Sequence, residues 1–514
     1  MRHASRMPVM PRRPGGFTWN RRAAGSALAG VVALSGLAAA PPSTLAAALY
    51  DPVTDGYSMA ATTANTGATA WWNAGYTGAG VDVALIDTGV APVDGLTTPG
   101  KIIYGPDLSL ESQAPNLRNL DTNGHGTFMA GLIAGKDSTL TAPYASAPAS
   151  AYRGMAPDAR ILSLKVGVAD GGTDVTQVIA AIDWVVQHRT DNGLNIRVIN
   201  LSYGTNSLQA STVDPLSYAV EQAWKQGIVV VAAAGNTGYQ KGQGAPGLAD
   251  PAYNSYVIGV GGYDSMGTVA VKDDEMGAYS AGSNGSCKCK EPDFLAIGSH
   301  LQGLRVTNGY IDVTHPEGLL GTRYFRGSGT SEAAAITSGT IALILQKYPA
   351  LTPDQVKNFI AANGQKVHGT SSKPQGGGEI DLAALATRTP ASYTQQFTNG
   401  TGTGTIEAAR GTDHLILDDT VLTGERDIFG DAVNTAGLAA AEAAGTSWSG
   451  GTWNGRSWSG SDWSGTSWSG RSWSGNDWSG TAWSGRSWSG TSWSGRSWSG
   501  RSWSGGSWAT GSWD

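Results

Sequence analysis

Cysteine is nearly absent from this sequence, since the 514 residues contain only two, Cys287 and Cys289. With one residue between them, their Cα atoms and Cβ directions are badly placed for an unstrained bridge. A scaffold held together by disulfides is therefore excluded, and stability has to come from a large apolar core. No second cysteine pair or histidine cluster lies nearby, so we expect two thiols in a surface loop rather than a metal or redox pair.

Charged residues are also scarce, at 14% of the chain, whereas an average soluble domain has about 25%. The formal net charge is −6, and the Lys and Arg residues gather into no basic stripe. Proteins that bind nucleic acid usually carry a strong positive footprint. We therefore expect no nucleic-acid partner.

Long apolar runs are missing except near the start of the chain, where Ala, Val, Leu and Gly fill residues 23–40 after a pair of arginines. A basic stretch, an apolar run and small residues near Ala40 and Ala48 are typical of a secretory signal peptide. A transmembrane anchor is the alternative, but the Gly and Ala content and the proline pair that follows favour cleavage. We expect a secreted protein with no stable membrane anchor, a signal peptide over 1–48 cut near residue 40 or 48, and a short segment over 49–64.

Tryptophan, in contrast, is abundant: of 19 residues, 14 recur every five positions from Trp448 to Trp513, mostly in Ser-Trp-Ser-Gly units. A period of five matches neither the two-residue repeat of a strand nor the 3.6-residue turn of a helix. For residues 445–514 we favour a disordered linker with spaced aromatics, and a compact solenoid is the alternative. Exposed indoles could contact the cell wall, or the tail could be a spacer.

Strands and helices alternate through the middle of the chain. Apolar runs predict strands at 81–86, 160–168, 197–201, 228–234 and 256–260, and helical periodicity predicts helices at 174–189, 216–226, 330–348 and from Pro353 onward. This alternation indicates βαβ units. We expect an α/β fold, with a doubly wound, mostly parallel sheet and helices on both faces, followed by a linker or small appendage over 388–444.

Three polar residues stand where predicted strands and helices meet. Asp87 ends a strand in Ile-Asp-Thr-Gly, His125 opens a helix in Asn-Gly-His-Gly-Thr, and Ser331 opens another in Gly-Thr-Ser. Alone, each has an ordinary explanation as a turn or helix-start residue. Together they supply a hydroxyl nucleophile, a base near neutral pH and a carboxylate that orients the base. They therefore predict a catalytic triad, and the lack of a Gly-x-Ser-x-Gly elbow argues against a lipase or esterase fold.

A fourth residue fits the same chemistry. Asn236 follows the apolar run that ends in Ala234-Gly235. An amide side chain after a strand is commonly a turn residue. Beside a nucleophile, however, it can share the negative oxygen of a tetrahedral intermediate with the backbone N–H of Ser331. With the triad in place, we favour this oxyanion-hole interpretation.

These motifs resemble those of the subtilisin-like serine proteases (subtilases, peptidase family S8) over roughly 65–387, and the tail resembles that of exported actinobacterial members. The order Asp, His, Ser along the chain is that of subtilisin. The resemblance implies a subtilisin-like fold whose catalytic groups are Asp87, His125, Ser331 and Asn236. It further implies that a peptide lies as an added strand between two rims and above a side-chain pocket, to which Ser202, Gly204, Gly172, Ala234 and Gly235 belong.

Some positions depart from the family pattern. Glu332 and Ala335 stand where the family usually has Met after the nucleophile and Pro three residues later. Phe128 replaces a common His, and Ile297 a common Pro. None of these changes removes a catalytic group, but we expect Glu332 to reshape the mouth of the site beside Ser331.

Carboxylates near the expected site have two further interpretations. Asp250 lies near the family's specificity pocket, so it either attracts a basic substrate side chain or, as we favour, is a loop aspartate with its side chain in water. The resemblance implies no cofactor for the chemistry and allows a structural calcium ion. Candidate oxygen ligands, with no diagnostic spacing, are Asp51, Asp55, Asp107 and Asp121.

The sequence therefore predicts a secreted serine endopeptidase that acts as a monomer on protein or peptide substrates. Two alternatives stay open. A non-catalytic protein could use the same domain as a peptide clamp and the Trp tail as a cell-wall anchor, although the complete set of catalytic residues speaks against it. An ester hydrolase is the other alternative, and the expected edge strand at 202–204 favours peptides.

Overall fold

The computed structural model describes residues 50–239, 247–282, 290–371, 373–417, 420–449 and 451–457, together with 467–468 and 471–472. The predicted signal peptide, both cysteines and most of the tryptophan repeat lie outside these described residues. All statements below concern the described part of the chain.

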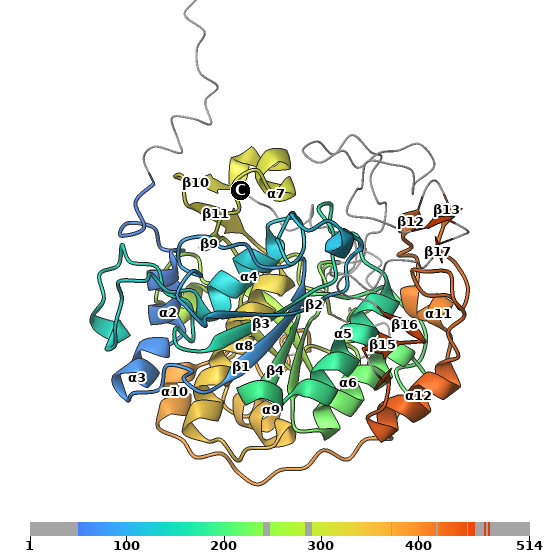
Figure 1. The fold of residues 1–514 in the computed structure, drawn as a ribbon. Coiled ribbons are helices and arrows are strands. Elements are labelled where there is room, and N and C mark those ends of the chain that lie inside the picture. The colour runs from blue at the N-terminus through green and yellow to red at the C-terminus, as the bar shows by residue number, and fades with distance from the viewer. Residues whose placement is uncertain are drawn as a thin grey trace, which may run out of the picture. The chain divides into compact units, whose positions relative to one another are not determined.

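An eight-stranded sheet forms the centre of the fold (Figure 1). Its order is β2-β3-β1-β4-β5-β6-β7, with β8 pairing with β6, and all pairs are parallel except β6 with β7. Residues of β1 and β5 are buried throughout, as expected for parallel strands covered on both faces. The strands are β1 (Asp82–Asp87), β2 (Ile102–Asp107), β3 (Arg160–Lys165), β4 (Ile196–Leu201), β5 (Val229–Ala233), β6 (Ile258–Asp264), β7 (Glu275–Met276) and β8 (Phe294–Ile297).

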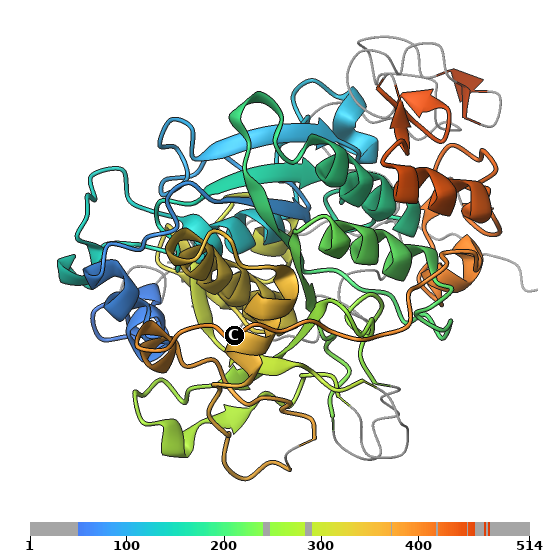
Figure 2. The ribbon, with the colours of Figure 1, turned by 90° about the horizontal axis from the view of Figure 1, so that it is seen from below.

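Two layers of helices cover this sheet. Helices α4 and α8 pack together on one face, and α5 and α6 pack together on the other (Figure 2). The doubly wound α/β fold predicted from the sequence is thus confirmed. The main helices are α4 (His125–Ala134), α5 (Val175–His188), α6 (Pro215–Lys225), α8 (Thr330–Lys347) and α9 (Pro353–Ala361).

Smaller elements surround these layers. The short helices are α2 (Met59–Asn65), α3 (Ala68–Asn73), α7 (Tyr310–Thr314), α10 (Leu382–Ala386), α11 (Ile406–Arg410) and α12 (Thr435–Ala444). The outlying strands are β9 (Leu301–Leu304), β10 (Leu319–Leu320), β11 (Tyr324–Gly327), β12 (Ile416–Leu417), β13 (Thr420–Val421), β14 (Trp448–Ser449), β15 (Thr452–Trp453), β16 (Arg456–Ser457), β17 (Ser467–Trp468) and β18 (Arg471–Ser472). Among the described residues, no helix is both long and apolar enough to span a bilayer.

Helix starts follow local capping signals. Asp174 and Gln177 form a capping box at the start of α5. Asp214 and Thr352 cap α6 and α9, each directly before a proline in the first helical position. Gly227, just after α6, has φ +84°, the left-handed conformation that commonly ends a helix. The predicted helices therefore form with boundaries shifted by only a residue or two.

The strand predictions were less accurate than the helix predictions. The strand predicted at 160–168 already ends at Lys165, and the buried strand β8 was not predicted. The strand predicted at 256–260 begins at Ile258 and continues to Asp264, because three glycines interrupt its apolar pattern. Strand β2 was not predicted. It lies at the edge of the sheet and is mostly half-buried, so its residues do not show the continuous apolar run of a central strand.

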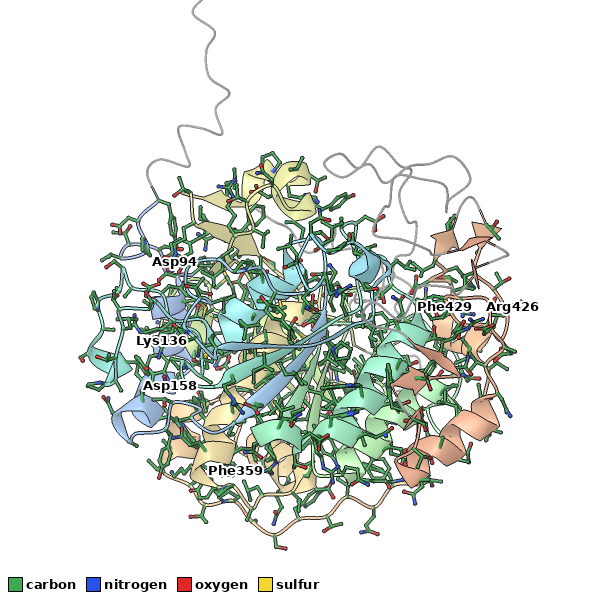
Figure 3. All side chains as sticks on the ribbon, in the orientation of Figure 1. Asp94, Lys136, Asp158, Phe359, Arg426 and Phe429 are labelled. Carbon is green, nitrogen blue, oxygen red and sulfur yellow. The ribbon has the colours of Figure 1, made fainter. Side chains whose placement is uncertain are left out.

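Residues 388–399 run past α9, where Gln395 contacts Asp354. The described residues from 400 to 457 pack beside α5 and α6, where α11, α12 and β14 contact these helices (Figures 1 and 2). Apolar side chains such as Ile428 and Phe429 are buried in this appendage, and Figure 3 marks the position of Phe429. A buried ion pair links the appendage to α5: Arg410 Nε donates to Asp174 Oδ2 at 2.6 Å. Both side chains are fully buried, so the pair joins the appendage to the N-terminal end of α5.

The first two units of the tryptophan repeat also pack on α5. Trp448 and Trp453 face each other across the β14–β15 hairpin, and both are buried. Their indole N–H groups donate to the carbonyl of Ala180 and to Asp183 Oδ2, each at 2.7 Å. Buried indoles need such acceptors. These two units are folded onto the domain, whereas for most of the repeat the choice between linker and solenoid stays a prediction.

We expect Arg410→Met to destabilise the protein by about 3–5 kcal/mol, because it leaves the Asp174 carboxylate buried without its cation. Denaturant unfolding followed by circular dichroism measures the change. The matched control is Arg456→Met, which removes a partly exposed pair with Asp431 and should cost at most about 1 kcal/mol. Equal losses for the two variants would contradict the assignment. Adding Asp174→Asn to Arg410→Met should recover part of the stability.

Candidate active site

The predicted catalytic residues meet at one edge of the sheet. Asp87 is the last residue of β1, and Asn236 follows β5 by three residues. His125 and Ser331 are the first and second residues of α4 and α8, two helices that pack on each other. In parallel α/β sheets, ligands bind at the carboxyl ends of the strands. The sequence-predicted groups therefore lie where this architecture places a binding site.

A buried hydrogen bond joins Asp87 to His125. His125 Nδ1 lies 2.8 Å from Asp87 Oδ1 and 3.0 Å from Oδ2, and both side chains are shielded from solvent. This contact assigns the proton to Nδ1 and turns Nε2 into the acceptor of the neutral ring. Burial lowers the pKa of His125 well below its usual 6.5, which keeps the imidazole neutral and able to take up a proton.

Thr88 supports both members of this pair. Its backbone N–H donates to Asp87 Oδ1 at 2.7 Å, and its hydroxyl accepts from the N–H of Gly126 at 2.9 Å. Burial raises the pKa of Asp87, while the hydrogen bonds from Thr88 oppose that rise because they stabilise the carboxylate. The loop after β1 thus fixes the start of α4 directly against the carboxylate.

Glycines allow this close approach. A Cβ on Gly126 would lie 2.1 Å from the carbonyl oxygen of Gly89, so any side chain there would push α4 away from β1. Gly89 itself has φ +109°, a conformation that favours glycine. The glycines of the Asp-Thr-Gly and His-Gly motifs therefore let the backbones of these two segments pack directly against each other.

Two buried residues, Asp121 and Lys165, support the same loops; the sequence pointed to Asp121 only as a candidate calcium ligand and did not mark Lys165. Asp121 accepts the N–H groups of Gly124 and Thr127, both at 2.7 Å, and so organises the first turn of α4. Lys165, at the end of β3, donates to the carbonyls of Thr88 and Leu120 at 2.9 and 2.7 Å. The only sequence signals were an aspartate just before a helix start and a lysine ending an apolar strand.

Ser331 is held against the end of β4. Its hydroxyl donates to the carbonyl of Ser202 at 3.4 Å, and the Ser202 hydroxyl donates to the carbonyl of Ser331 at 3.1 Å. Asn200 donates to the Ser202 hydroxyl at 3.0 Å and accepts from Ser338, about two helical turns further into α8, at 2.8 Å. These contacts fix the first turns of α8 relative to the strand.

The Asn236 amide is oriented by Thr330. Asn236 Oδ1 accepts the backbone N–H and the hydroxyl of Thr330, both at 2.9 Å. The same hydroxyl accepts the N–H of Gly235 at 3.1 Å. Because Oδ1 is held in this way, Nδ2 points to the other side of the amide, beside the start of α8.

The residues predicted to form the rims and the pocket differ in their burial and in the hydrogen bonds that their backbones make. Gly172 uses its own backbone groups in a turn: its N–H donates to Asp170 Oδ1 at 3.1 Å, and its carbonyl accepts from Val168 at 3.1 Å. Ser202 and Gly204 follow β4 directly and are buried. Ala234 is tied by backbone hydrogen bonds to neighbouring segments. Gly235 is the one of these five residues that lines a cavity.

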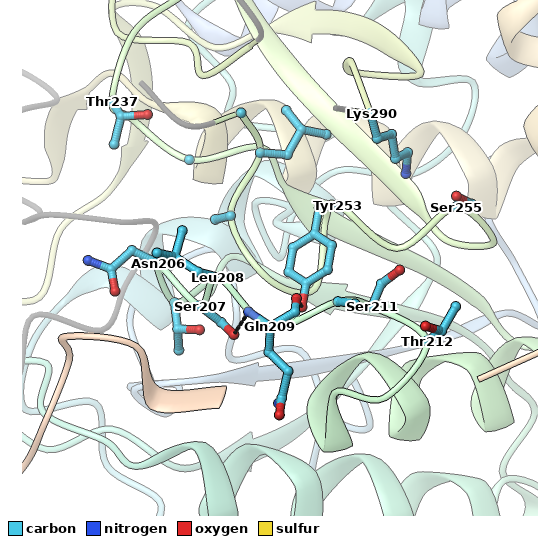
Figure 4. Close-up of a pocket in the computed structure, with 16 residues that line it drawn as sticks. Asn206, Ser207, Leu208, Gln209, Ser211, Thr212, Thr237, Tyr253, Ser255 and Lys290 are labelled. Atoms are coloured by element: carbon cyan, nitrogen blue, oxygen red, sulfur yellow. Dashed lines mark hydrogen bonds between the residues drawn. The ribbon is translucent and has the colours of Figure 1, made fainter. Parts of the chain in front are cut away.

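Gly235 belongs to the lining of a cavity of about 500 Å³ (Figure 4). Its walls combine apolar and neutral polar groups, and Tyr253 closes one side by donating its hydroxyl to the carbonyl of Gln209 at 2.9 Å. Other lining residues include Leu208, Leu248, Ala249 and Lys290. The cavity therefore opens next to the oxyanion-hole candidate, and we call it the Gly235 cavity.

The charged groups around this cavity are already paired. Lys290 Nζ donates to the carbonyls of Ala252, Asn254 and Val257 at 2.9, 2.7 and 2.8 Å. Burial lowers its pKa to about 7, against the attraction of the nearby Asp293 carboxylate. The ammonium is thus committed to the protein rather than to a substrate.

The favoured interpretation of Asp250, a loop aspartate with its side chain in water, was wrong. Its side chain is fully buried, not in water, and its Oδ1 accepts the hydroxyl of Ser217 in α6 at 2.9 Å. Burial and the neighbouring Asp214 carboxylate raise the pKa of Asp250 well above its usual value. The carboxyl is therefore directed at the helix and is not a ready anion for a basic substrate side chain.

The candidate calcium ligands do not fit a shared site. Asp107 accepts the N–H groups of Ser109 and Asn119, and Asp55 pairs with Arg326 at 2.9 Å. Asp121 is committed to the start of α4, as described above. In the described ranges, no group of three or more His, Cys, Asp or Glu side chains converges as a metal site would.

Comparison with known proteins identifies the chain. The model of the subtilase family matches residues 78–403, more than half of the sequence. Serine protease AprX of Bacillus subtilis (strain 168) is 35% identical over 308 residues, which cover 59% of this chain and 66% of that protein. Subtilisin DY of Bacillus licheniformis is 34% identical over 317 residues, covering 61% and 93%.

A third relative is the minor extracellular protease Epr of Bacillus subtilis (strain 168), 30% identical over 318 residues, or 62% of this chain and 40% of that protein. The matches agree with the observed α/β fold. The chain belongs to the subtilase family and is a serine-type endopeptidase.

Proposed function

We propose that this protein is a secreted endopeptidase in which Ser331 is the nucleophile, His125 the general base and Asp87 the group that orients it. The observation that carries the proposal is the buried contact of 2.8 Å between His125 Nδ1 and Asp87 Oδ1. A carboxylate in this position selects the tautomer whose Nε2 accepts the serine proton. Asn236 and the backbone N–H of Ser331 form the oxyanion hole.

The reaction is acyl transfer in two halves. Ser331 Oγ forms a bond to the scissile carbonyl carbon while its proton passes to His125, and the carbonyl electron pair moves onto oxygen. When that pair returns, the C–N bond breaks and His125 gives its proton to the leaving amine. Water then repeats the sequence on the acyl-enzyme and releases the acid, so that serine and histidine are regenerated.

The Gly235 cavity supports a preference for uncharged substrate side chains. Its position beside Asn236 suits the residue that precedes the scissile bond. Its volume of about 500 Å³ is ample for a large side chain. Since Lys290 is tied to three carbonyls and Asp250 faces α6, the cavity offers a basic substrate side chain no free carboxylate among the described residues.

The start of the sequence supports secretion, because residues 23–40 follow the pattern of a secretory signal. One relative is, by its name, an extracellular protease. We further propose that the protein works as a monomer on proteins and peptides, without a membrane anchor or nucleic acid. The tryptophan repeat beyond the units docked on α5 is the part that would contact the cell wall.

Ser331→Ala is expected to abolish covalent labelling by a fluorophosphonate probe and to lower casein cleavage by about 10⁶-fold, because the attacking oxygen is lost. Mass spectrometry of the secreted, labelled protein measures the adduct and the N-terminal cut together. Ser328→Ala, three residues earlier, is the matched control and should still be labelled. A folded wild type that takes no label would instead indicate a non-catalytic peptide-binding protein.

Asn236→Ala should lower kcat by about 10²–10³ with a much smaller change in KM, because one donor to the oxyanion is removed. Steady-state kinetics on a fluorogenic peptide amide separates the two constants. Asn363→Ala serves as the control, since its amide donates to the carbonyl of Phe359 at the end of α9. A KM effect without loss of kcat would place Asn236 in substrate binding instead.

Peptides with Phe or Leu before the scissile bond should be cleaved at least about tenfold faster, in kcat/KM, than those with Arg or Asp, because an unpaired charge is costly to bury. Internally quenched peptides that differ only at that position test this. Preference for Arg or Lys would show that Asp250 acts on the substrate after all.

A further inference from the structure

Glu332 lies in the centre of the site and has no part in the mechanism above. It follows Ser331 directly in the first turn of α8, at the position where the family usually has Met. Its side chain is only 3% exposed. Within the described part of the chain, no Lys or Arg forms an ion pair with it. Burial of a carboxyl group costs free energy, and for Glu332 no ion pair with a described residue offsets that cost.

The Glu332 carboxyl group lies beside the Asn236 amide. A Cβ built on Gly329, the residue before α8, would stand 2.8 Å from Glu332 Oε2 and 3.3 Å from Asn236 Nδ2. The two atoms therefore lie on the same side of Gly329, no more than about 6 Å apart. Thr330 holds the Oδ1 end of the amide, so a rotation of the amide would break both contacts.

The other ionisable groups facing Glu332 do not neutralise a negative charge. Asp87, at the end of β1, carries a negative charge of its own, and the charge of Glu332 contributes a small part of the rise in the pKa of Asp87. Tyr279, in the turn after β7, has its pKa raised by burial and, in smaller part, by Glu332, and its hydroxyl contacts Ser299 at 3.0 Å. On α4, His125 is already paired with Asp87. Burial raises the pKa of Glu332 to about 8, so the carboxyl is neutral at neutral pH.

We propose that Glu332 sets the charge beside the oxyanion position and thereby makes peptide hydrolysis depend on pH. This inference rests on the proposed roles of Ser331 and Asn236. As a neutral carboxyl, Glu332 leaves the N–H of Asn236 directed to the developing oxyanion. As a carboxylate, it competes for that N–H and opposes the negative oxygen electrostatically.

The direction of the effect follows from the protonation states. Well below its pKa, the Glu332 carboxyl is protonated and neutral. The carboxylate replaces this form as the pH rises through about 8. The transition state gains negative charge at the oxyanion, whereas the bound substrate does not. Ionisation therefore raises the barrier and lowers kcat more than it changes KM. We expect an alkaline decline of kcat/KM of at least about tenfold.

The test is the pH profile of kcat/KM between pH 6 and 10 for the wild type, Glu332→Gln and Glu332→Met. Each protein is judged by the ratio of its own values at pH 7 and pH 9.5. The wild-type ratio should be at least about tenfold, with an apparent pKa near 8, and both variants should lose this decline because neither side chain ionises. Circular dichroism at each pH excludes unfolding as the cause.

Glu379→Gln is the matched control, since Glu379 is a second buried carboxyl whose pKa is raised, to about 9, but next to Asp274. Its profile should match that of the wild type. An undiminished decline in Glu332→Gln, or a flat wild-type profile, overturns the inference. End-point fluorophosphonate labelling at pH 7 separates this result from failure of the proposed function, because a labelled Ser331 shows that the nucleophile is competent.

Discussion

The hydrogen bond between Asp87 and His125 imposes the strictest geometric demand on this structure. It brings the end of the central strand β1 into contact with the first residue of α4, and both partners are buried. That approach is possible because Gly126 leaves room for the carbonyl of Gly89. Thr88 and Asp121 then hold the loop and the helix start in register. Much of the polar network at this edge of the sheet serves to keep one carboxylate against one imidazole.

Many parts of the fold and site could be predicted because their signals are local. Central strands are continuous apolar runs, and Asp174, Asp214 and Thr352 cap the helices they precede. The catalytic candidates stand in short motifs at the ends of these elements. Edge strand β2 could not be predicted, since a half-buried strand carries a weak pattern. Lys165 was missed because its role depends on carbonyls from two other loops.

Family resemblance located segments but not the direction in which each group faces. Asp250 lies next to the Gly235 cavity in sequence, yet its carboxyl meets Ser217 in α6. Gly172 lies in the expected rim, but its own turn uses its backbone N–H and carbonyl. The orientation of Asp250 depends on a partner 33 residues away in the chain, and that of Gly172 on a local turn. Glu332 differs from these two residues, because the sequence alone shows the change from the family's usual Met, and this one change places an ionisable group within the family's fold.

The ion pair between Arg410 and Asp174 joins residues 236 positions apart. During synthesis, α5 and the adjoining rim leave the ribosome long before the arginine that neutralises their buried carboxylate. The peptidase fold can therefore reach its final stability only after residues 388–457 have emerged and docked. Through Arg410, the peptidase domain thus gains its full stability only when a later segment of the chain is present, although that segment supplies none of the proposed catalytic groups.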